Sequence, residues 1–198
     1  DIQLILPEWD GDHSDVFLQL TGLKQHSIRP FSITITKDMS SQSLSDRVKR
    51  LLTLNVKYIE LRNDILPESE ILALCEIIPK ENILVSFREK SESLKKFVVF
   101  KGLLYDWALE LGECTLPAPG IISQHKDFSE SLLLAYEAKG YFIKVSPMVN
   151  SFNDLLQFHQ WWQQSKENRS FLPRSDSGRW AWYRTLFGVS QQVHFVRE

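Results

Sequence analysis

The chain has 198 residues, of which 43% are hydrophobic and 12% aromatic, which is enough apolar mass for one sizeable core. Lys plus Arg number 23 against 25 Asp plus Glu, so there is no basic field to attract nucleic acid, and we expect none as a partner. No stretch approaches the roughly 20 apolar residues that cross a bilayer, so no membrane contact is expected. The two cysteines, Cys75 and Cys114, show no metal or disulfide spacing, which favours a cytoplasmic protein.

From Phe31 onward, short runs rich in β-branched and aromatic residues alternate with longer segments of helical periodicity, which is typical of parallel βα units. The predicted strands cover residues 31–36, 57–62, 82–87, 106–111, 120–125, 141–148, 169–175 and 191–196. The predicted helices cover residues 43–54, 67–78, 91–104, 127–140, 151–165 and 178–187. This alternation predicts an α/β protein, a compact (β/α)8 TIM-type barrel over residues 30–198, with residues 1–29 as an N-terminal extension.

The segment between the fourth and fifth predicted strands breaks the alternation. Residues 112–120, GECTLPAPG, are too few and too rich in proline for a crossover helix. We therefore expect a barrel with a missing or shortened helix between strands 4 and 5. A doubly wound open sheet is the alternative, although its commonest version needs a GxGxxG after the first strand, and this chain has none there.

Several predicted strands carry ionisable side chains at or near their carboxyl ends, where a parallel barrel builds its active site. These residues are Glu60, Arg62, Arg88, Glu110, His125 and Lys144. Glu60 and Arg62 are two positions apart, so they lie on the same face of their strand. Arginines at a barrel mouth suit an anionic, hydroxylated substrate, but they equally suit a solvated ring of ion pairs with Glu60 and Glu92.

Lys144 lies among apolar residues in the sixth predicted strand. Burial disfavours the ammonium form, and the neutral amine is the form that attacks a carbonyl. His125, at the end of the preceding strand, can carry the protons that forming and resolving a Schiff base require. The plainer alternatives are a lysine that reaches solvent from an edge strand and a hydrogen-bonded structural histidine.

Four segments resemble, in order, motifs of type I 3-dehydroquinate dehydratase (type I dehydroquinase), a Schiff-base barrel enzyme of the shikimate pathway of aromatic amino acid biosynthesis. YIELRND resembles the family's E-L-R-x-D, and VSFREKSE resembles its F-x-F-R followed by glutamate. IISQHKDF resembles I-S-x-H-D-F, and YFIKVSPM resembles D-I-V-K-I-A-x-M. The resemblance runs from about Phe31 to Glu198.

The resemblance implies a hydro-lyase that converts 3-dehydroquinate to 3-dehydroshikimate and water without a metal or an organic cofactor. It makes Lys144 the Schiff-base lysine, His125 the proton-transfer residue and Glu92 the residue that orients the histidine. The side chains implied to bind the substrate hydroxyls and the ring are Glu60, Arg62 and Arg88.

The family also has an arginine after strand seven that binds the substrate carboxylate. The segment GRWAWYRTLFG departs from the family pattern here. We favour Arg184 by its distance from the last strand, with Arg174 and Arg179 left open. The family's glycine pair after the Arg88 segment and its lid after strand eight are also absent from the sequence.

These departures keep two rivals open: a catalytically silent, ligand-binding dehydroquinase-like barrel, and a class I aldolase-type imine enzyme. The resemblance further implies a fused or associated shikimate dehydrogenase, and a homodimer is left open. No helix is predicted after the last strand. We expect the extension to cover that gap through Val16, Phe17, Leu18 and Leu20.

Overall fold

A computed structural model of the chain describes residues 31–36, 43–54, 56–188 and 190–197. The expected packing of residues 1–29 lies outside the described residues. Eight parallel strands form one sheet in the order β7-β6-β5-β4-β3-β2-β1-β8. They are β1 (Phe31–Thr34), β2 (Tyr58–Arg62), β3 (Ile83–Phe87), β4 (Leu104–Ala108), β5 (Ile121–Gln124), β6 (Phe142–Val145), β7 (Arg169–Phe171) and β8 (His194–Arg197).

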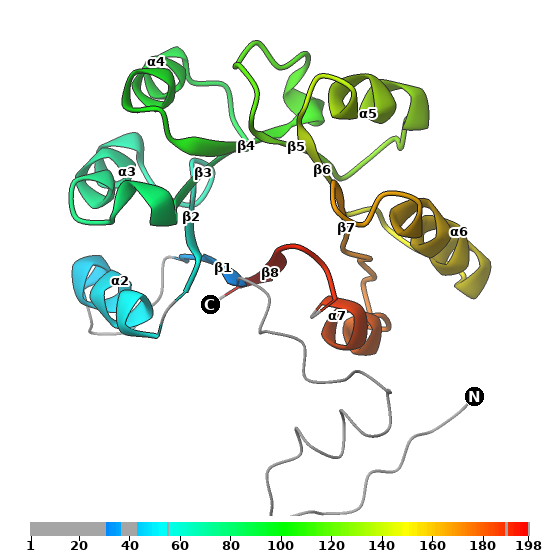
Figure 1. Cartoon of the computed structure of the whole chain (residues 1–198). Helices are drawn as coiled ribbons and strands as arrows, with labels where there is room; N and C mark the ends of the chain where they lie inside the picture. The colour runs from blue at the N-terminus through cyan, green and yellow to red at the C-terminus, as the bar shows by residue number, and fades with distance from the viewer. Residues whose placement is uncertain (1–30, 37–42, 55, 189, 198) are drawn as a thin grey trace, which may run out of the picture.

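Helices cover the outer, convex face of this sheet, which curls into most of a ring (Figure 1). The α-helices of the described residues are α2 (Leu44–Thr53), α3 (Glu68–Cys75), α4 (Glu92–Lys101), α5 (Glu130–Glu137), α6 (Phe152–Gln163) and α7 (Ala181–Gly188). Three of them begin where a serine hydroxyl accepts a hydrogen bond from the backbone N–H three residues on: Ser43, Ser91 and Ser151. In the part of the chain that the structure describes, no helix is long and apolar enough to span a membrane.

The two edges of the sheet face each other across a seam. β7 and β8 end the strand order, and the described residues show no strand pairing between them. The side-chain amide of the fully buried Gln191 takes the place of a strand there. It accepts from the Phe171 N–H at 3.1 Å and donates to the Phe171 carbonyl at 2.8 Å. The α/β class with eight parallel strands is confirmed, and the curled sheet is consistent with a TIM-like fold, although the described residues do not form a closed barrel of paired strands.

The fourth strand differs from its prediction. We expected it at residues 106–111, whereas β4 covers Leu104–Ala108 and a 3-10 turn, η2 (Leu109–Leu111), follows. Gly102 ends α4 in the left-handed conformation, with φ of 61°, and releases the chain into the strand two residues earlier than predicted. A second 3-10 turn, η1 (Lys80–Asn82), precedes β3.

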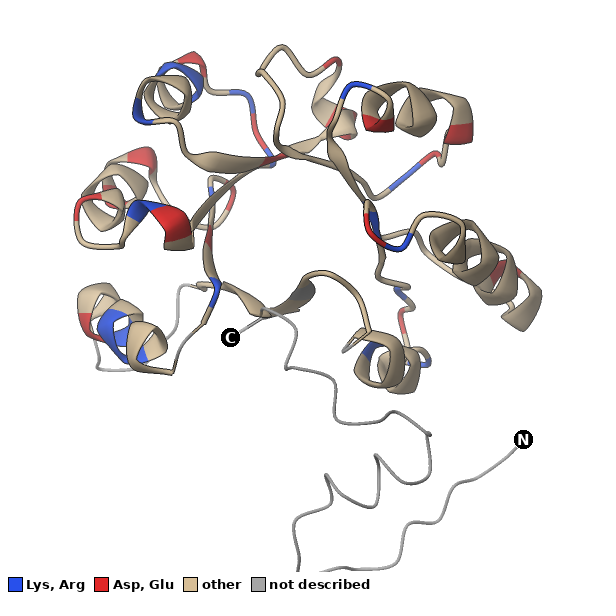
Figure 2. Ribbon diagram, in the orientation of Figure 1, with Lys and Arg blue, Asp and Glu red and all other residues tan. Residues whose placement is uncertain are grey.

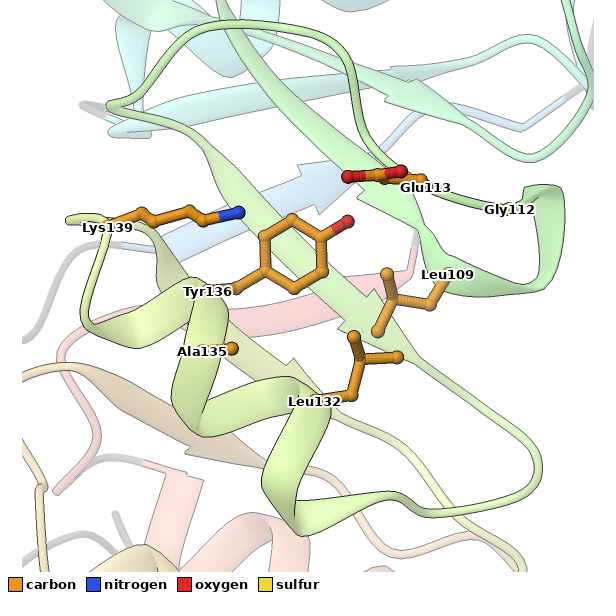
Figure 3. A pocket seen from close by; sticks show the side chains of 7 residues that line it. All are labelled: Leu109, Gly112, Glu113, Leu132, Ala135, Tyr136 and Lys139. Carbon is orange, nitrogen blue, oxygen red and sulfur yellow. The ribbon is translucent and has the colours of Figure 1, made fainter.

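A loop takes the place of a helix between β4 and β5, as the proline-rich segment predicts. Aromatic side chains of the neighbouring elements hold its backbone: Tyr105 and Tyr141 donate hydroxyl hydrogen bonds to Pro117 O and Leu116 O, Trp107 donates to Gly112 O, and the Tyr136 hydroxyl accepts from Cys114 N–H. Beside this loop, against α5, lies a groove of about 420 Å³ (Figure 3). The groove is on the helical side of the sheet.

The sheet separates two sets of buried side chains. The larger cluster lies between strands and helices and includes Ile59, Val85, Phe87 and Trp107. The smaller cluster is made of residues on the concave face: Leu84, Ile121, Leu172 and Phe195. The partly buried side chains of Tyr58, Leu104 and Phe142 pack against this smaller cluster. Because strand residues alternate between faces, the positions two residues further along those three strands, Glu60, Asp106 and Lys144, also point into the bore, the space that the curled sheet encloses.

Candidate active site

Two acidic and two basic side chains meet in the bore, beyond its apolar cluster. Lys144 of β6 donates a hydrogen bond to Asp106 Oδ2 of β4, and its Nζ lies 3.7 Å from Glu60 Oε1 of β2. Arg88, directly after β3, donates from Nη2 to Asp106 Oδ2 at 2.7 Å and lies 3.8 Å from Glu60 Oε1. Two cations and two anions make this quartet (Glu60, Arg88, Asp106 and Lys144) formally neutral. Figure 2 marks acidic and basic positions along the strands of the ring.

Hydroxyl groups and an aromatic ring complete the surroundings of the quartet. Thr34 of β1 and Ser86 of β3 donate their hydroxyl hydrogens to the Glu60 carboxylate, Ser86 at 2.6 Å. The Lys144 ammonium lies over the Phe195 ring, 4.1 Å from its centroid. A cation that has left water gains from such a ring face. Lys144 is 5% exposed and Glu60 4% exposed, so this charge cluster lies inside the sheet and not at its rim.

Both carboxylates of the quartet are ionised. Burial alone raises the pKa of Asp106, but Arg88 and Lys144 outweigh it and hold that pKa well below its usual range. Burial likewise opposes ionisation of Glu60, whose pKa Lys144 and Arg88 nevertheless lower. Burial works against the charge of Arg88 too, yet Asp106 and Glu60 raise its pKa. Each charge in the bore therefore depends on the opposite charges around it.

Several buried polar atoms of the bore have no hydrogen-bond partner among the described residues. They are Asp106 Oδ1, Ser32 Oγ of β1 and Ser170 Oγ of β7. Buried polar atoms in native proteins nearly always have a partner, and unmatched ones need an explanation. An acceptor oxygen and two hydroxyls on the strands that enclose the bore are suited to a ligand that carries hydroxyl groups.

His125 lies at the mouth of the bore, on the strand next to Lys144. Ser123 pairs with Lys144 in the β5–β6 register, so His125 follows two residues later on the same face and at the carboxyl end. Its Nδ1 lies 3.2 Å from Glu110 Oε2, and Glu110 Oε1 accepts from the backbone N–H groups of His125 and Lys126. Partial burial raises the pKa of Glu110, but these hydrogen bonds, led by the imidazole, bring it to about 2.

Glu92 does not take the position that the sequence comparison implied. It begins α4 with its side chain 75% exposed and accepts from Lys95 at 2.8 Å. The carboxylate beside His125 belongs to Glu110 instead. Glu92 and His125 are therefore not in contact in this structure, because a residue at the first turn of α4 faces solvent and the lysine one turn on.

Arg62 also points away from the quartet. Its guanidinium donates to both carboxylate oxygens of Asp64, at 3.0 and 2.6 Å, in the turn that follows β2. The side chain is 29% exposed, so it lies at the mouth while Glu60 lies inside. Of the two residues expected together on one face of the strand, only Glu60 reaches Arg88 and Lys144.

The three candidate arginines after β7 differ in their surroundings. Arg174 donates to the carbonyls of Ser146 and His125, at 2.7 and 2.8 Å, which places its guanidinium over the mouth. Arg184 is half-buried on α7, and both burial and Arg174 lower its pKa. No acidic partner for Arg184 is present among the described side chains. Arg179 stacks on Trp180 and donates to a carbonyl at 3.4 Å, so it lies on the rim.

Asp106 was not predicted from the sequence as a site residue, although it contacts both cations of the quartet. The available signal was an acidic residue inside the apolar run LYDWA. The sequence pattern predicts a strand that begins at Asp106, whereas β4 has this residue at its centre. In the described part of the chain, no three His, Cys, Asp or Glu side chains are grouped to hold a metal ion.

Comparisons with protein-family models, with curated proteins and with solved structures found no match to this chain.

Proposed function

We propose that the chain is a hydro-lyase that dehydrates 3-dehydroquinate to 3-dehydroshikimate through an imine on Lys144. The observation that carries this proposal is a buried lysine inside a TIM-like sheet, one strand away from a histidine at the same mouth. Burying a lysine, an arginine and two carboxylates costs desolvation free energy, and such clusters of buried ionisable groups are typical of functional sites. The four sequence motifs that resemble type I dehydroquinase supply the choice of substrate.

In the proposed reaction, the neutral amine of Lys144 attacks the ring ketone, and the carbinolamine loses water to give a protonated imine. The imine withdraws electrons from the neighbouring carbon and acidifies its C–H bond. His125 removes that proton, and the electron pair moves toward the imine nitrogen. The pair then returns to form the C=C bond as the hydroxyl leaves, protonated by the same imidazolium. Water finally hydrolyses the imine and releases the enone.

Charges and hydroxyls around the lysine support a substrate that is both anionic and hydroxylated. Arg174 brings positive charge to the mouth, and Arg184, whose pKa Arg174 lowers, has no acidic partner among the described residues, so a substrate carboxylate has counter-charges to pair with. Asp106 Oδ1, Ser32 and Ser170 offer hydrogen-bonding capacity inside the bore. Holding the ring between these two sets places its ketone beside Lys144, a positioning effect that supplies several kcal/mol of the barrier.

Borohydride reduction in the presence of 3-dehydroquinate tests this proposal. We expect the ligand to become attached at Lys144, detected as a mass increase on the peptide that contains it, and to be absent from Lys144→Met. His125→Gln should still be trapped, with turnover lower by roughly 10²–10⁴-fold because the proton-transfer group is gone. Attachment to another lysine, or substrate binding without any trapping, would show the mechanism to be wrong.

A catalytically silent, ligand-binding barrel is the second candidate. It is favoured by one observation: Lys144 is already engaged by Asp106 and Glu60, and His125 contacts Glu110 and not Glu92. Ultraviolet absorbance of the conjugated enone product separates the two candidates. Saturable binding of 3-dehydroquinate with no rise in absorbance would favour the silent barrel.

A further inference from the structure

Asp106 is the carboxylate of the quartet that contacts both cations directly. It is 0% exposed, and a single one of its oxygens, Oδ2, accepts hydrogen bonds from both Lys144 and Arg88. Glu60 approaches the same two cations only at 3.7 and 3.8 Å, and its oxygens are occupied by the hydroxyls of Thr34 and Ser86. The direct restraint on the lysine is therefore Asp106.

We propose that Asp106 is a positioning residue that holds Lys144 as an ammonium ion, turned toward β4, until a carbonyl ligand enters the bore. Which reaction the lysine then carries out rests on the proposed function. The restraint of Lys144 by Asp106 rests on the observed contacts alone. A substrate hydroxyl that donates to Asp106 Oδ1 would weaken this hold, because the carboxylate then shares its charge with a second donor.

Each described charged group around Lys144 favours either its ammonium form or its neutral amine. Asp106 and Glu60 favour the ammonium, whereas Arg88, which faces the lysine across Asp106, opposes it. From β8 the Phe195 ring presents its face, which also favours the cation. His125 and Arg174 lie beyond these groups, at the mouth. Removing the Asp106 charge leaves two cations and one anion, so the balance moves toward the neutral amine.

Imine formation needs the neutral amine of Lys144. The ammonium gives one proton to water, the free electron pair of the amine forms the C–N bond with a carbonyl carbon, and the carbonyl oxygen leaves as water. A small probe reports the first step without any natural substrate: formaldehyde condenses with a neutral amine, and cyanoborohydride reduces the resulting imine by hydride transfer to carbon, which leaves an N-methyl group.

The experiment measures methylation of Lys144 from pH 6 to pH 10 by mass spectrometry of its peptide, in the folded full chain. We expect Asp106→Asn to shift the midpoint of the Lys144 profile downward by about one pH unit, which raises methylation near pH 7.5 about tenfold. Glu76→Gln, which removes one negative charge from an exposed pair with Lys101, serves as the matched control and should leave the profile unchanged.

The midpoint of the pH profile distinguishes a change in the protonation of Lys144 from easier entry of the probe into the bore. A loosened bore would raise methylation by the same factor at every pH, without moving the midpoint, and would overturn the proposal. Asp106→Glu keeps the charge and should restore the wild-type midpoint. If Asp106→Asn does not fold, Glu60→Gln should move the midpoint in the same direction by a smaller amount, and an unchanged profile there would also contradict the hold. A chain that shows the shift but never dehydrates 3-dehydroquinate would disprove the proposed function and leave this inference standing.

Discussion

Glu110 links the histidine of the site to the backbone that carries it. Its two oxygens receive the imidazole Nδ1 of His125 and two consecutive backbone N–H groups, so one carboxylate fixes both the ring and the turn after β5. Arg174 holds the same turn from the other side through the His125 carbonyl. At the scale of residues, the site depends on charged groups that grip the main chain as well as one another.

Replacing Glu110 tests this anchoring. The pKa of Glu110 is about 2 in the folded protein and ordinarily 4.5, so its carboxylate stabilises the fold fully above pH 4.5, and this stabilisation is lost as the pH falls toward 2. We expect Glu110→Gln to lower Tm by about 2–4 °C at pH 6, a small effect because water partly screens the group. The difference from wild type should shrink below pH 4.5. A constant difference across that range would rule out the carboxylate as its cause.

The sequence predicted which polar side chains share the concave face of the sheet, because alternation in a parallel strand fixes the face of each residue. The side chains of Glu60, Arg88 and Lys144 lie on that face, and His125 follows β5 at its carboxyl end. Contacts made by loops and by the first turns of helices do not follow the two-residue alternation of a strand. That Glu110 and not Glu92 lies beside His125 depends on the position of the η2 turn, for which the sequence shows no periodic pattern.

Helix packing around α6 depends on a histidine among aromatic rings. The Nδ1 atom of His159 lies 2.7 Å from the Tyr183 hydroxyl of α7, and its ring contacts those of Trp162, Tyr183 and Phe187. Burial, and then Lys166, lower the pKa of His159 below 6.5. The neutral imidazole is therefore the form that joins α6 to α7.

A group with a lowered pKa loses stabilisation as acid is added, because the unfolded chain takes up the proton first. Stability should therefore fall below about pH 6.5 in the wild type. In His159→Asn, which does not titrate, Tm at pH 7.5 should already be lower, and its further drop between pH 7.5 and pH 5 should be smaller than that of wild type by roughly 1–3 °C. Parallel curves for the two proteins would show that His159 does not titrate in this range.

At the scale of the whole sheet, the described residues join β7 to the segment before β8 through a side chain and not through an eighth pair of strands. The order of the strands was predictable, since consecutive parallel strands joined by helices lie side by side. The seam between β7 and β8 was not, because eight strands in a sequence do not show that the described parts of the seventh and eighth strands lack a pairing. A buried glutamine near the last strand carries no periodic signal of this role.

Gln191→Leu fills a similar volume but leaves the Phe171 N–H and carbonyl without partners. Such unsatisfied buried groups cost about 1–3 kcal/mol each. We expect Tm to fall by about 4–8 °C, the shift that about 2 kcal/mol gives in a chain of this size. Gln163→Leu, at an exposed position of α6, is the control and should change Tm little. Equal stability of the two variants would show that the amide does not hold the seam.

The strand order also determines how far along the chain each pairing must reach during folding. Strands β2 to β7 each pair with the strand before them in the chain, so six of the pairings join segments that are near each other in sequence. The seventh joins Phe31 to His194 and must close almost the entire described chain into one loop. Loop-closure entropy makes such a contact slow to form. We therefore expect the β1–β8 pair to be the last part of the sheet to assemble, and the contact between the Phe195 ring and Lys144 to form with that step.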